Sequence, residues 1–390
     1  MSRLSCLSVL LAVACGGGNG GGDPDADVVA FDRRAMLAHL ADHLFVPTYE
    51  QFEADAAALA TALEAHCAAL DTGADDPSAA RTAWATAMDT WELADAVQVG
   101  PSAADDGRVR NRIYGWPLLA PCTLDQDVMV RWTTPAAYDV ETRLDNARSL
   151  AAIEYLLFYT DVVSSCPVPP TGWDALGADR PRARCRLAAA VAADVAAQAA
   201  ALATAWRPTG GNYRDQLALA GTAGSSIAGE REAVNMVSDG MFYVDTMVKD
   251  MKLGEAAGIT INACGTIEEP CLREVEHRFA DHSTPALRVN LRALRAAFTG
   301  TTAGADGPGF DDYLTAVGAP EVAARMTASI DAAIALADDL PASFLTTLTT
   351  DRARVVALHA ATKAITDDMK SQFLTVLGLD IPDDVAGDND

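Results

Sequence analysis

The sequence predicts an all-α fold built from two tandem four-helix-bundle-like domains. Apolar residues recur three or four positions apart along most of the chain, as on one face of a helix, and alternating strand patterns are scarce. Alanine, the strongest helix former, fills many positions between them. The clearest runs are Phe52, Ala56, Leu59, Leu63, Cys67; Leu187, Val191, Val195, Ala199, Leu202; Leu287, Leu291, Leu294, Phe298; and Leu358, Ala361, Ile365, Met369, Phe373. Helices with one apolar face pack together as bundles.

The first fourteen residues have the layout of a bacterial lipoprotein signal peptide. One basic residue, Arg3, precedes a mostly apolar run that ends in small residues before Cys15. We expect residues 1–14 to be removed and Cys15 to carry the lipid, although an ordinary secretory signal has a similar layout. Residues 15–27, rich in glycine and aspartate, cannot bury a core and predict a flexible tether. Either kind of signal places the protein outside the cytoplasm.

A break of sequence Arg-Pro-Thr-Gly-Gly at residues 207–211 divides the rest of the chain into near-equal halves. Each half holds enough periodic sequence for about four helices. We therefore expect one helical bundle over residues 28–206, a second over residues 212–380 and an acidic tail over residues 381–390. No stretch after the signal offers the ~20 consecutive apolar residues of a spanning helix, so we expect a soluble body.

Six cysteines remain in the chain after the lipidated one. An even number in an oxidising compartment indicates disulfides, although six cysteines allow fifteen pairings. A thiolate metal site is the alternative, but no Cys-x-x-Cys spacing supports it. The preferred pairing, in which the first two pairs each span a loop with proline or glycine, is Cys264 with Cys271, Cys166 with Cys185, and Cys67 with Cys122.

Acidic residues outnumber basic ones 54 to 29, which gives a formal net charge of −25. Such a surface repels nucleic acid and anionic membranes, and it attracts cations or basic partners. The same charge would also serve solubility alone. Charge therefore argues against a nucleic-acid partner but by itself identifies no ligand. The partners that we expect are a membrane, through the lipid anchor, a cation or small ligand, and an envelope protein.

One carboxylate, Glu154, lies in the almost wholly apolar helical stretch from Ser149 to Phe158. No positive side chain stands at helical spacing to pair with it. A lone buried carboxylate is costly unless it is neutralised, hydrogen-bonded or bound to a cation. Glu154 is therefore either a cation ligand or a structural carboxylate that accepts hydrogen bonds from a neighbouring helix.

Four short elements follow one another along the chain in the order of a known set of motifs. The stretch 149–158 matches Gly-x-His-x-x-Glu followed by Tyr-Leu-Leu-Phe, with Ser149 in place of the glycine and Ala151 in place of the histidine. The other elements are the helix 83–101, with two tryptophans, Asp95 and a closing Gly-Pro; residues 113–117, similar to Ile-x-x-Trp-Pro; and residues 276–284, similar to Glu-Ser-x-Phe-Ser-Asp-Asn-Thr. Together they resemble the motifs of the imelysin family.

This resemblance implies a two-domain helical protein of the periplasm or cell surface, in a family with members described as peptidases, iron-regulated proteins and components of iron uptake. It also implies a site between the two helical domains that includes the signature histidine and glutamate. Because Ala151 replaces that histidine, we do not expect peptidase activity. A metal site of the family type also loses its nitrogen ligand at this position.

The candidate ligands come from the family-like segments. Carboxylates with at most one imidazole favour a hard cation, such as ferric iron or calcium, over zinc. The candidates are Glu154, Asp95, Glu276, Asp281 and His282.

We therefore expect a lipid-anchored, non-catalytic binding protein of the cell envelope, on the periplasmic face of the outer membrane or exposed on it, and linked to uptake of iron or another cation. The alternatives are a metallopeptidase of the imelysin type and an interaction scaffold whose site has decayed.

Overall fold

A computed structural model describes residues 31–383 and 385–386, apart from the side chain of residue 106. From Phe31 onward the chain forms one compact unit. The described residues contain helices and no strand, which confirms the all-α prediction. The expected signal peptide 1–14, Cys15 and the tether 15–27 lie outside the described residues, as do residue 384 and residues 387–390 of the acidic tail.

The α-helices are joined or extended by short 3-10 and π-helical segments, which carry the prefix η. The α-helices are α1 (Arg33–Leu40), α2 (Val46–Asp71), α3 (Ser78–Asp95), α4 (Ala104–Ile113), α5 (Pro121–Thr133), α6 (Leu150–Phe158), α7 (Arg180–Trp206), α8 (Tyr213–Ala218), α9 (Glu230–Met241), α10 (Ser283–Thr299), α11 (Phe310–Ala316), α12 (Pro320–Asp339), α13 (Phe344–Thr350), α14 (Arg352–Asp368) and α15 (Leu374–Leu377). The η segments are η1 (Ala41–Phe45), η2 (Gly100–Ser102), η3 (Pro135–Ala137), η4 (Val140–Thr142), η5 (Asp145–Ala147), η6 (Asp174–Asp179), η7 (Val244–Glu255) and η8 (Met369–Phe373).

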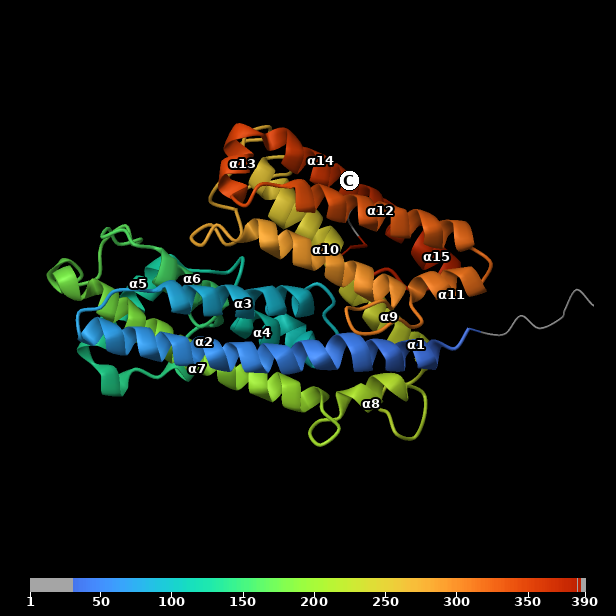
Figure 1. Cartoon of the computed structure of the whole chain (residues 1–390), viewed down its shortest axis with the longest axis horizontal. Coiled ribbons are helices and arrows are strands. Elements are labelled where there is room, and N and C mark those ends of the chain that lie inside the picture. The colour runs from blue at the N-terminus through green and yellow to red at the C-terminus, as the bar shows by residue number, and fades with distance from the viewer. Residues whose placement is uncertain (1–30, 384, 387–390) are drawn as a thin grey trace, which may run out of the picture. The chain divides into compact units, whose positions relative to one another are not determined.

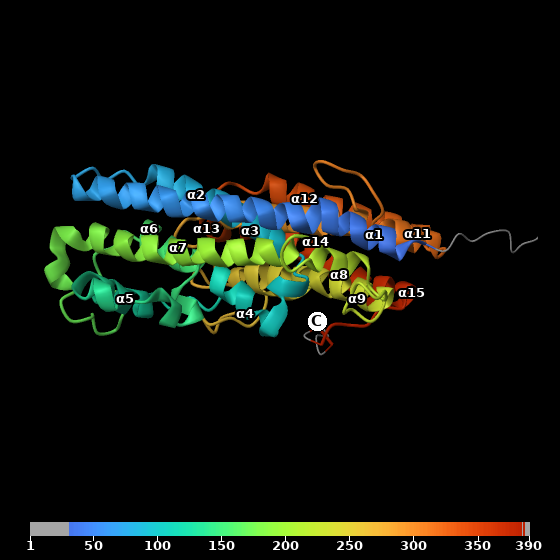
Figure 2. The same ribbon diagram turned by 90° about the horizontal axis from the view of Figure 1, so that it is seen from below.

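The helices form two groups that meet along α3 and α10. In the first group, α2 runs beside α7 and α3, as Figures 1 and 2 both show. In the second group, α12 packs against α10 and α14, and α14 packs against η7. Helix α10 lies against α3, so side chains from distant parts of the sequence meet there.

The break expected to separate two bundles, residues 207–211, forms the turn between α7 and α8. The helices that follow this turn, α8 and α9, pack against α1. The division of the chain into two domains stays a prediction.

The segment Asp174–Trp206, which joins η6 and α7, is long and apolar enough to cross a membrane by length and composition. Half of its most apolar window is buried within the protein, and α7 packs along α2. A buried core helix of a bundle can be as long and as apolar as a membrane-spanning helix. This segment is therefore weak evidence for a membrane span.

The helical periodicity of the sequence accounts for the core. The repeated apolar positions of α2, such as Phe52, Leu59 and Leu63, are fully buried. On α3, the indole of Trp84 is also fully buried, and its Nε1 donates a hydrogen bond to the carbonyl oxygen of Leu150 at 2.9 Å. This bond ties α3 to the first residue of α6 and so fixes the two helices that carry the carboxylates described below.

Three disulfides are present: Cys67–Cys185, Cys122–Cys166 and Cys264–Cys271. The last pair confirms the sequence-based prediction, and the other two predicted pairs are wrong. The reason is the antiparallel course of α2 and α7, because the end of α2 that carries Cys67 meets the beginning of α7 that carries Cys185. All six cysteines form disulfides, so none of them remains as a thiolate ligand.

Candidate functional site

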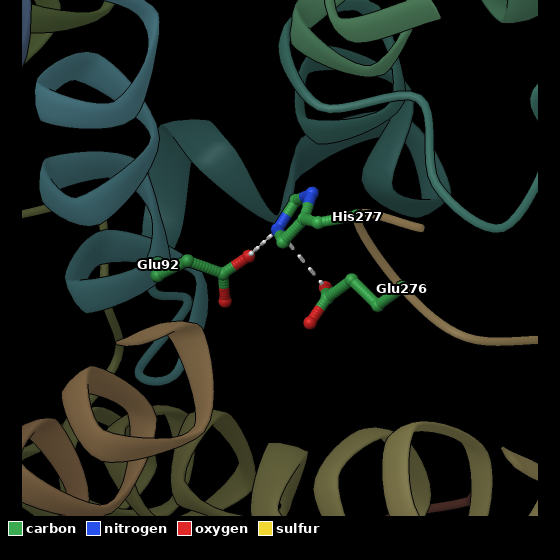
Figure 3. A group of neighbouring side chains, drawn as sticks. All are labelled: Glu92, Glu276 and His277. Atoms are coloured by element: carbon green, nitrogen blue, oxygen red, sulfur yellow. Dashed lines mark hydrogen bonds and ion pairs between the residues drawn. The ribbon is translucent and has the colours of Figure 1, made fainter. Parts of the chain in front are cut away.

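A cluster of buried charged side chains lies where α3, α6, η7 and the segment before α10 meet. We call Glu92, Glu154, Lys252, Glu276 and His277 the buried cluster. Each of them is at most 2% exposed. Figure 3 shows Glu92, Glu276 and His277 pointing toward one another from α3 and from the segment that precedes α10.

The imidazole of His277 lies between two carboxylates. Its Nε2 is 3.1 Å from Glu92 Oε1, and its Nδ1 is 3.3 Å from Glu154 Oε2. Burial alone would lower the pKa of His277, but the carboxylates of Glu276, Glu154 and Glu92 outweigh burial and raise this pKa to about 10. His277 is therefore a cation at neutral pH, and both ring nitrogens donate hydrogen bonds.

The backbone of His277 has a φ of +50°, in the left-handed region that residues other than glycine seldom adopt. Such conformations persist where the surrounding contacts hold them, and they are common at functional sites. Here the two carboxylates hold the imidazole from opposite sides.

Lys252 supplies the second positive charge of the buried cluster. Its Nζ lies 2.6 Å from Glu92 Oε2 and 2.8 Å from Glu276 Oε1, and it donates a hydrogen bond to Asn290 Oδ1 at 2.8 Å. Burial lowers the pKa of Lys252, and the nearby Glu92 carboxylate opposes that effect. Burial would raise the pKa of Glu92, but Lys252 and His277 together hold it well below its usual range.

Glu276 is the least satisfied member of the buried cluster. Neither of its carboxylate oxygens makes a hydrogen bond of good geometry, although Lys252 Nζ is close to one of them. Burial and the neighbouring charge of Glu92 raise the pKa of Glu276 well above its ordinary value. Burial therefore disfavours the charged form of Glu276, and the nearby ammonium of Lys252 and imidazole of His277 are the positive groups that oppose this effect.

Glu154 has a positioning role in this arrangement. Its Oε1 accepts hydrogen bonds from the backbone N–H groups of Phe279 and Ala280 at 2.9 and 3.0 Å, while its Oε2 faces His277. The partners that its own helix lacks thus come from the segment before α10. A carboxylate that holds the second nitrogen of a histidine is the usual outer partner of a metal-binding imidazole.

The geometry fits a small cation. Glu92, Glu276 and His277 each offer one ligand atom, and these atoms all lie within 4.8 Å of one another (Figure 3). The under-bonded carboxylate of Glu276 supplies a ligand without losing hydrogen bonds of its own. The ammonium of Lys252 lies between the two carboxylates, so a bound cation would have to displace it.

A small cavity of about 80 Å³ adjoins the buried cluster. Ala151, Glu154, His277 and Phe279 are among its lining residues. Binding sites for organic ligands have volumes of roughly 300–1,000 Å³. This cavity therefore has room for an ion and a few waters but not for a peptide.

The remaining sequence-predicted site residues lie outside the buried cluster. Asp95 is paired with Arg110, whose Nε is 3.0 Å from Asp95 Oδ1. Asp281 accepts a hydrogen bond from the backbone of Leu345 at 3.3 Å. The imidazole Nε2 of His282 is 2.7 Å from the more exposed carboxylate of Asp89. Of the five candidates, the structure thus brings together Glu154 and Glu276.

The family model described as Imelysin matches residues 45–372, a range that includes the whole buried cluster. The chain belongs to the imelysin family. No curated protein sequence matches it.

Two solved structures share the fold of this imelysin-family chain. An imelysin-like protein from Psychrobacter arcticum 273-4 has a TM-score of 0.68 at 17% identity, over 92% of this chain and 98% of that one. A protein from Parabacteroides distasonis ATCC 8503, titled "putative iron-regulated protein A precursor", has a TM-score of 0.65 at 17% identity, over 90% of this chain and 95% of that one. At this identity the likeness establishes the fold alone.

Proposed function

We propose that this imelysin-family protein is a non-catalytic binding protein of the cell envelope that binds a hard cation at Glu92, Glu276 and His277. The observation that carries the proposal is the convergence of these three ligand atoms within 4.8 Å at a buried position. Two carboxylates and one imidazole favour ferric iron or calcium. The name of the Parabacteroides protein, which describes it as iron-regulated, favours iron.

Cation binding would exchange positive charges within the buried cluster. His277 must lose a proton before a ring nitrogen can coordinate a metal, and Lys252 must leave the space between Glu92 and Glu276. In the cation-free protein, Lys252 and His277 supply the charge that the metal would bring. Two side-chain cations therefore occupy the proposed site until a metal ion arrives.

Several features argue against the metallopeptidase alternative. A metal-dependent peptidase needs a metal-activated water, a general base and space for a peptide. The adjoining cavity of about 80 Å³ does not provide that space, and Ala151 lines it in place of an imidazole.

We also propose where the protein acts. It is anchored by lipid at Cys15 and acts at the outer membrane, alone or with an envelope partner.

Glu276→Gln is the variant that tests the cation site most directly. Burial disfavours the charged form of Glu276, and its carboxylate makes no hydrogen bond of good geometry, so the amide should leave the cation-free melting temperature nearly unchanged. Its matched control is Glu64→Gln, on the exposed face of α2. We expect ferric citrate or calcium to raise the melting temperature of metal-free wild type and the control, and calorimetry to give one site.

Loss of that response in Glu276→Gln supports the proposal. An equal response in all three proteins would assign the effect to the acidic surface and contradict it. No response in any of them would favour the interaction scaffold. Metal-dependent cleavage of a peptide library that disappears in Glu276→Gln would replace the proposal by the peptidase.

A further inference from the structure

A second and larger cavity lies at the end of the first helix group where α2 and α6 end and α3 and α7 begin, on the left in Figure 1. Its volume is about 430 Å³, within the range of small-molecule sites. It shares no lining residue with the cavity beside the buried cluster. The larger cavity is therefore a separate candidate site.

Three arginines line this cavity, although acidic residues are far more numerous in the chain. They are Arg81 on α3 and Arg180 and Arg184 on α7. Within the described part of the chain, Arg81 and Arg180 form no ion pair. Arg81 donates hydrogen bonds to the carbonyl oxygen of Leu157, and Arg180 donates one to that of Trp173. Arg184 has one carboxylate near it, Asp125, at 3.9 Å. Among the described residues, the guanidinium groups of Arg81 and Arg180 thus have no carboxylate in contact.

Three buried nitrogens on lining residues have no hydrogen-bond partner. They are Nε of Arg180, Nε of Arg184 and Nδ1 of His66. Arg184 is only 4% exposed, so its unpaired donor is deep in the protein. An unsatisfied buried donor on a charged group is costly, and such groups nearly always have a partner. An anionic acceptor in the cavity would supply it.

The arginines are held in place before any ligand binds. The guanidinium of Arg81 lies 5.0 Å from the ring of Phe158, that of Arg180 lies 5.4 Å from Trp173, and that of Arg184 lies 5.0 Å from Tyr159. Cation–π contacts of this kind restrain the side chains. In addition, Cys185 of the disulfide between α2 and α7 lines the cavity. A pre-organised site loses less conformational entropy on binding.

The rest of the lining is largely apolar, with Leu156, Leu157 and Val162 among its members. Two exposed carboxylates, Asp75 and Asp161, also border the cavity. They would repel a second negative charge on a ligand. The site therefore suits a singly charged anion with an apolar body better than inorganic phosphate.

We propose that this cavity binds a small amphiphilic monocarboxylate, with the carboxylate at the guanidinium groups of Arg81, Arg180 and Arg184 and the hydrocarbon against Leu156, Leu157 and Val162. Arginine forms paired hydrogen bonds with a carboxylate, which fixes the orientation of the charged end. The apolar wall accepts the other end. This site is independent of the proposed cation site.

The probe is hexanoate, and its uncharged analogue hexanamide is the comparison ligand. Binding is measured by calorimetry and by the fluorescence of the tryptophans, which include Trp173 beside the arginines. We expect one hexanoate per chain, with hexanamide and inorganic phosphate each at least about tenfold weaker, because charge-assisted bonds and apolar burial both contribute. The double variant Arg81→Gln/Arg180→Gln should weaken hexanoate binding about tenfold or more. The charge-matched control Arg131→Gln/Arg352→Gln should bind as wild type does. It alters two arginines outside this cavity that form no ion pair with any described residue and that donate to backbone carbonyl oxygens.

A second variant guards against misfolding of the first. Val162 is 61% exposed, so Val162→Asp adds a negative charge to the lining without disturbing the core, and it should also weaken hexanoate binding. Unchanged hexanoate affinity in folded Arg81→Gln/Arg180→Gln and Val162→Asp would overturn the proposal, as would phosphate binding equal to hexanoate binding or no hexanoate binding at all. The cation response measured on the same variants should stay at the wild-type value, so failure of one site is distinguishable from failure of the other.

Discussion

Replacement of Lys252 by methionine tests whether the buried ammonium holds the cluster together in the absence of a cation. Methionine keeps a similar length and removes the charge next to Glu92 and Glu276. Removal of one partner from a buried ion pair typically costs about 3–5 kcal/mol, because the other charge stays buried. The entropy of unfolding is ~2.1 cal/mol/K per residue, so a body of about 355 residues should lose roughly 4–7 °C of melting temperature.

The assay is thermal unfolding of metal-free protein, followed by circular dichroism, with Lys363→Met as the control. Lys363 also pairs with a carboxylate, Asp367 at 2.8 Å, but this pair is exposed on α14. An exposed pair contributes ~0–1 kcal/mol, so the control should lose only about 1 °C.

The same variant also reports on cation binding. Because Lys252→Met removes the ammonium that competes with a metal ion for Glu92 and Glu276, calcium or ferric citrate should raise the melting temperature of the variant more than that of wild type. Equal losses in Lys252→Met and Lys363→Met would refute the reasoning about the buried charge. A large loss with no gain in cation response would show that the ammonium is structural and that no cation takes its place.

Four further outcomes follow from the contacts. The pKa of His277 is raised from 6.5 to about 10 in the folded protein, so its stabilisation is complete below pH 6.5 and is lost as pH rises toward 10. The free energy of unfolding should fall by about 5 kcal/mol across that window, and denaturant titrations should show a flatter pH profile for His277→Gln. Glu154→Gln should cost ~1–3 kcal/mol in the same titrations, because the amide N–H₂ would face a donor on His277. Removal of the disulfide in Cys67→Ser/Cys185→Ser, which closes a loop of 118 residues, should cost up to ~5 kcal/mol of unfolding free energy, and a loss below 1 kcal/mol would contradict the chain-entropy argument. Cys15→Ala should release the protein from membranes in fractionation, whereas retention after a high-salt wash would rule out the lipid anchor.

The fold was predictable because helical periodicity is a local property of the sequence. Positions such as Phe52 and Leu59 repeat at helical spacing whatever they pack against, and the structure buries them. Disulfide pairing depends instead on which helix ends meet. The contact of Cys67 with Cys185 follows from the antiparallel course of α2 and α7, and no spacing in the sequence encodes it.

The site was only partly predictable. Glu154 stands out because it interrupts an apolar helix, but its partners lie more than a hundred residues away. Glu92 carried a readable signal that we missed: Trp84, Met88, Trp91 and Glu92 follow the spacing of one helix face, so a carboxylate on the buried side of α3 was visible. Lys252 carried no comparable signal, because η7 contains several charged residues. Three of them, Asp245, Lys249 and Lys252, are buried, and only packing against α3 and α10 decides which one meets Glu92.

The buried cluster also constrains the order in which the chain can fold. Glu92 precedes its partner Lys252 by 160 residues, and Glu154 precedes His277 by 123 residues. As an exported chain emerges from the membrane with its N-terminus first, α3 and α6 therefore appear before the cations that neutralise their carboxylates. Dehydration of an unpaired carboxylate costs several kcal/mol, so this face of the nascent chain must stay in contact with water. The buried cluster can therefore close only after the segment that carries Lys252 and His277 has emerged. A chain truncated before Lys252 keeps Glu92 and Glu154 on an open, hydrated face.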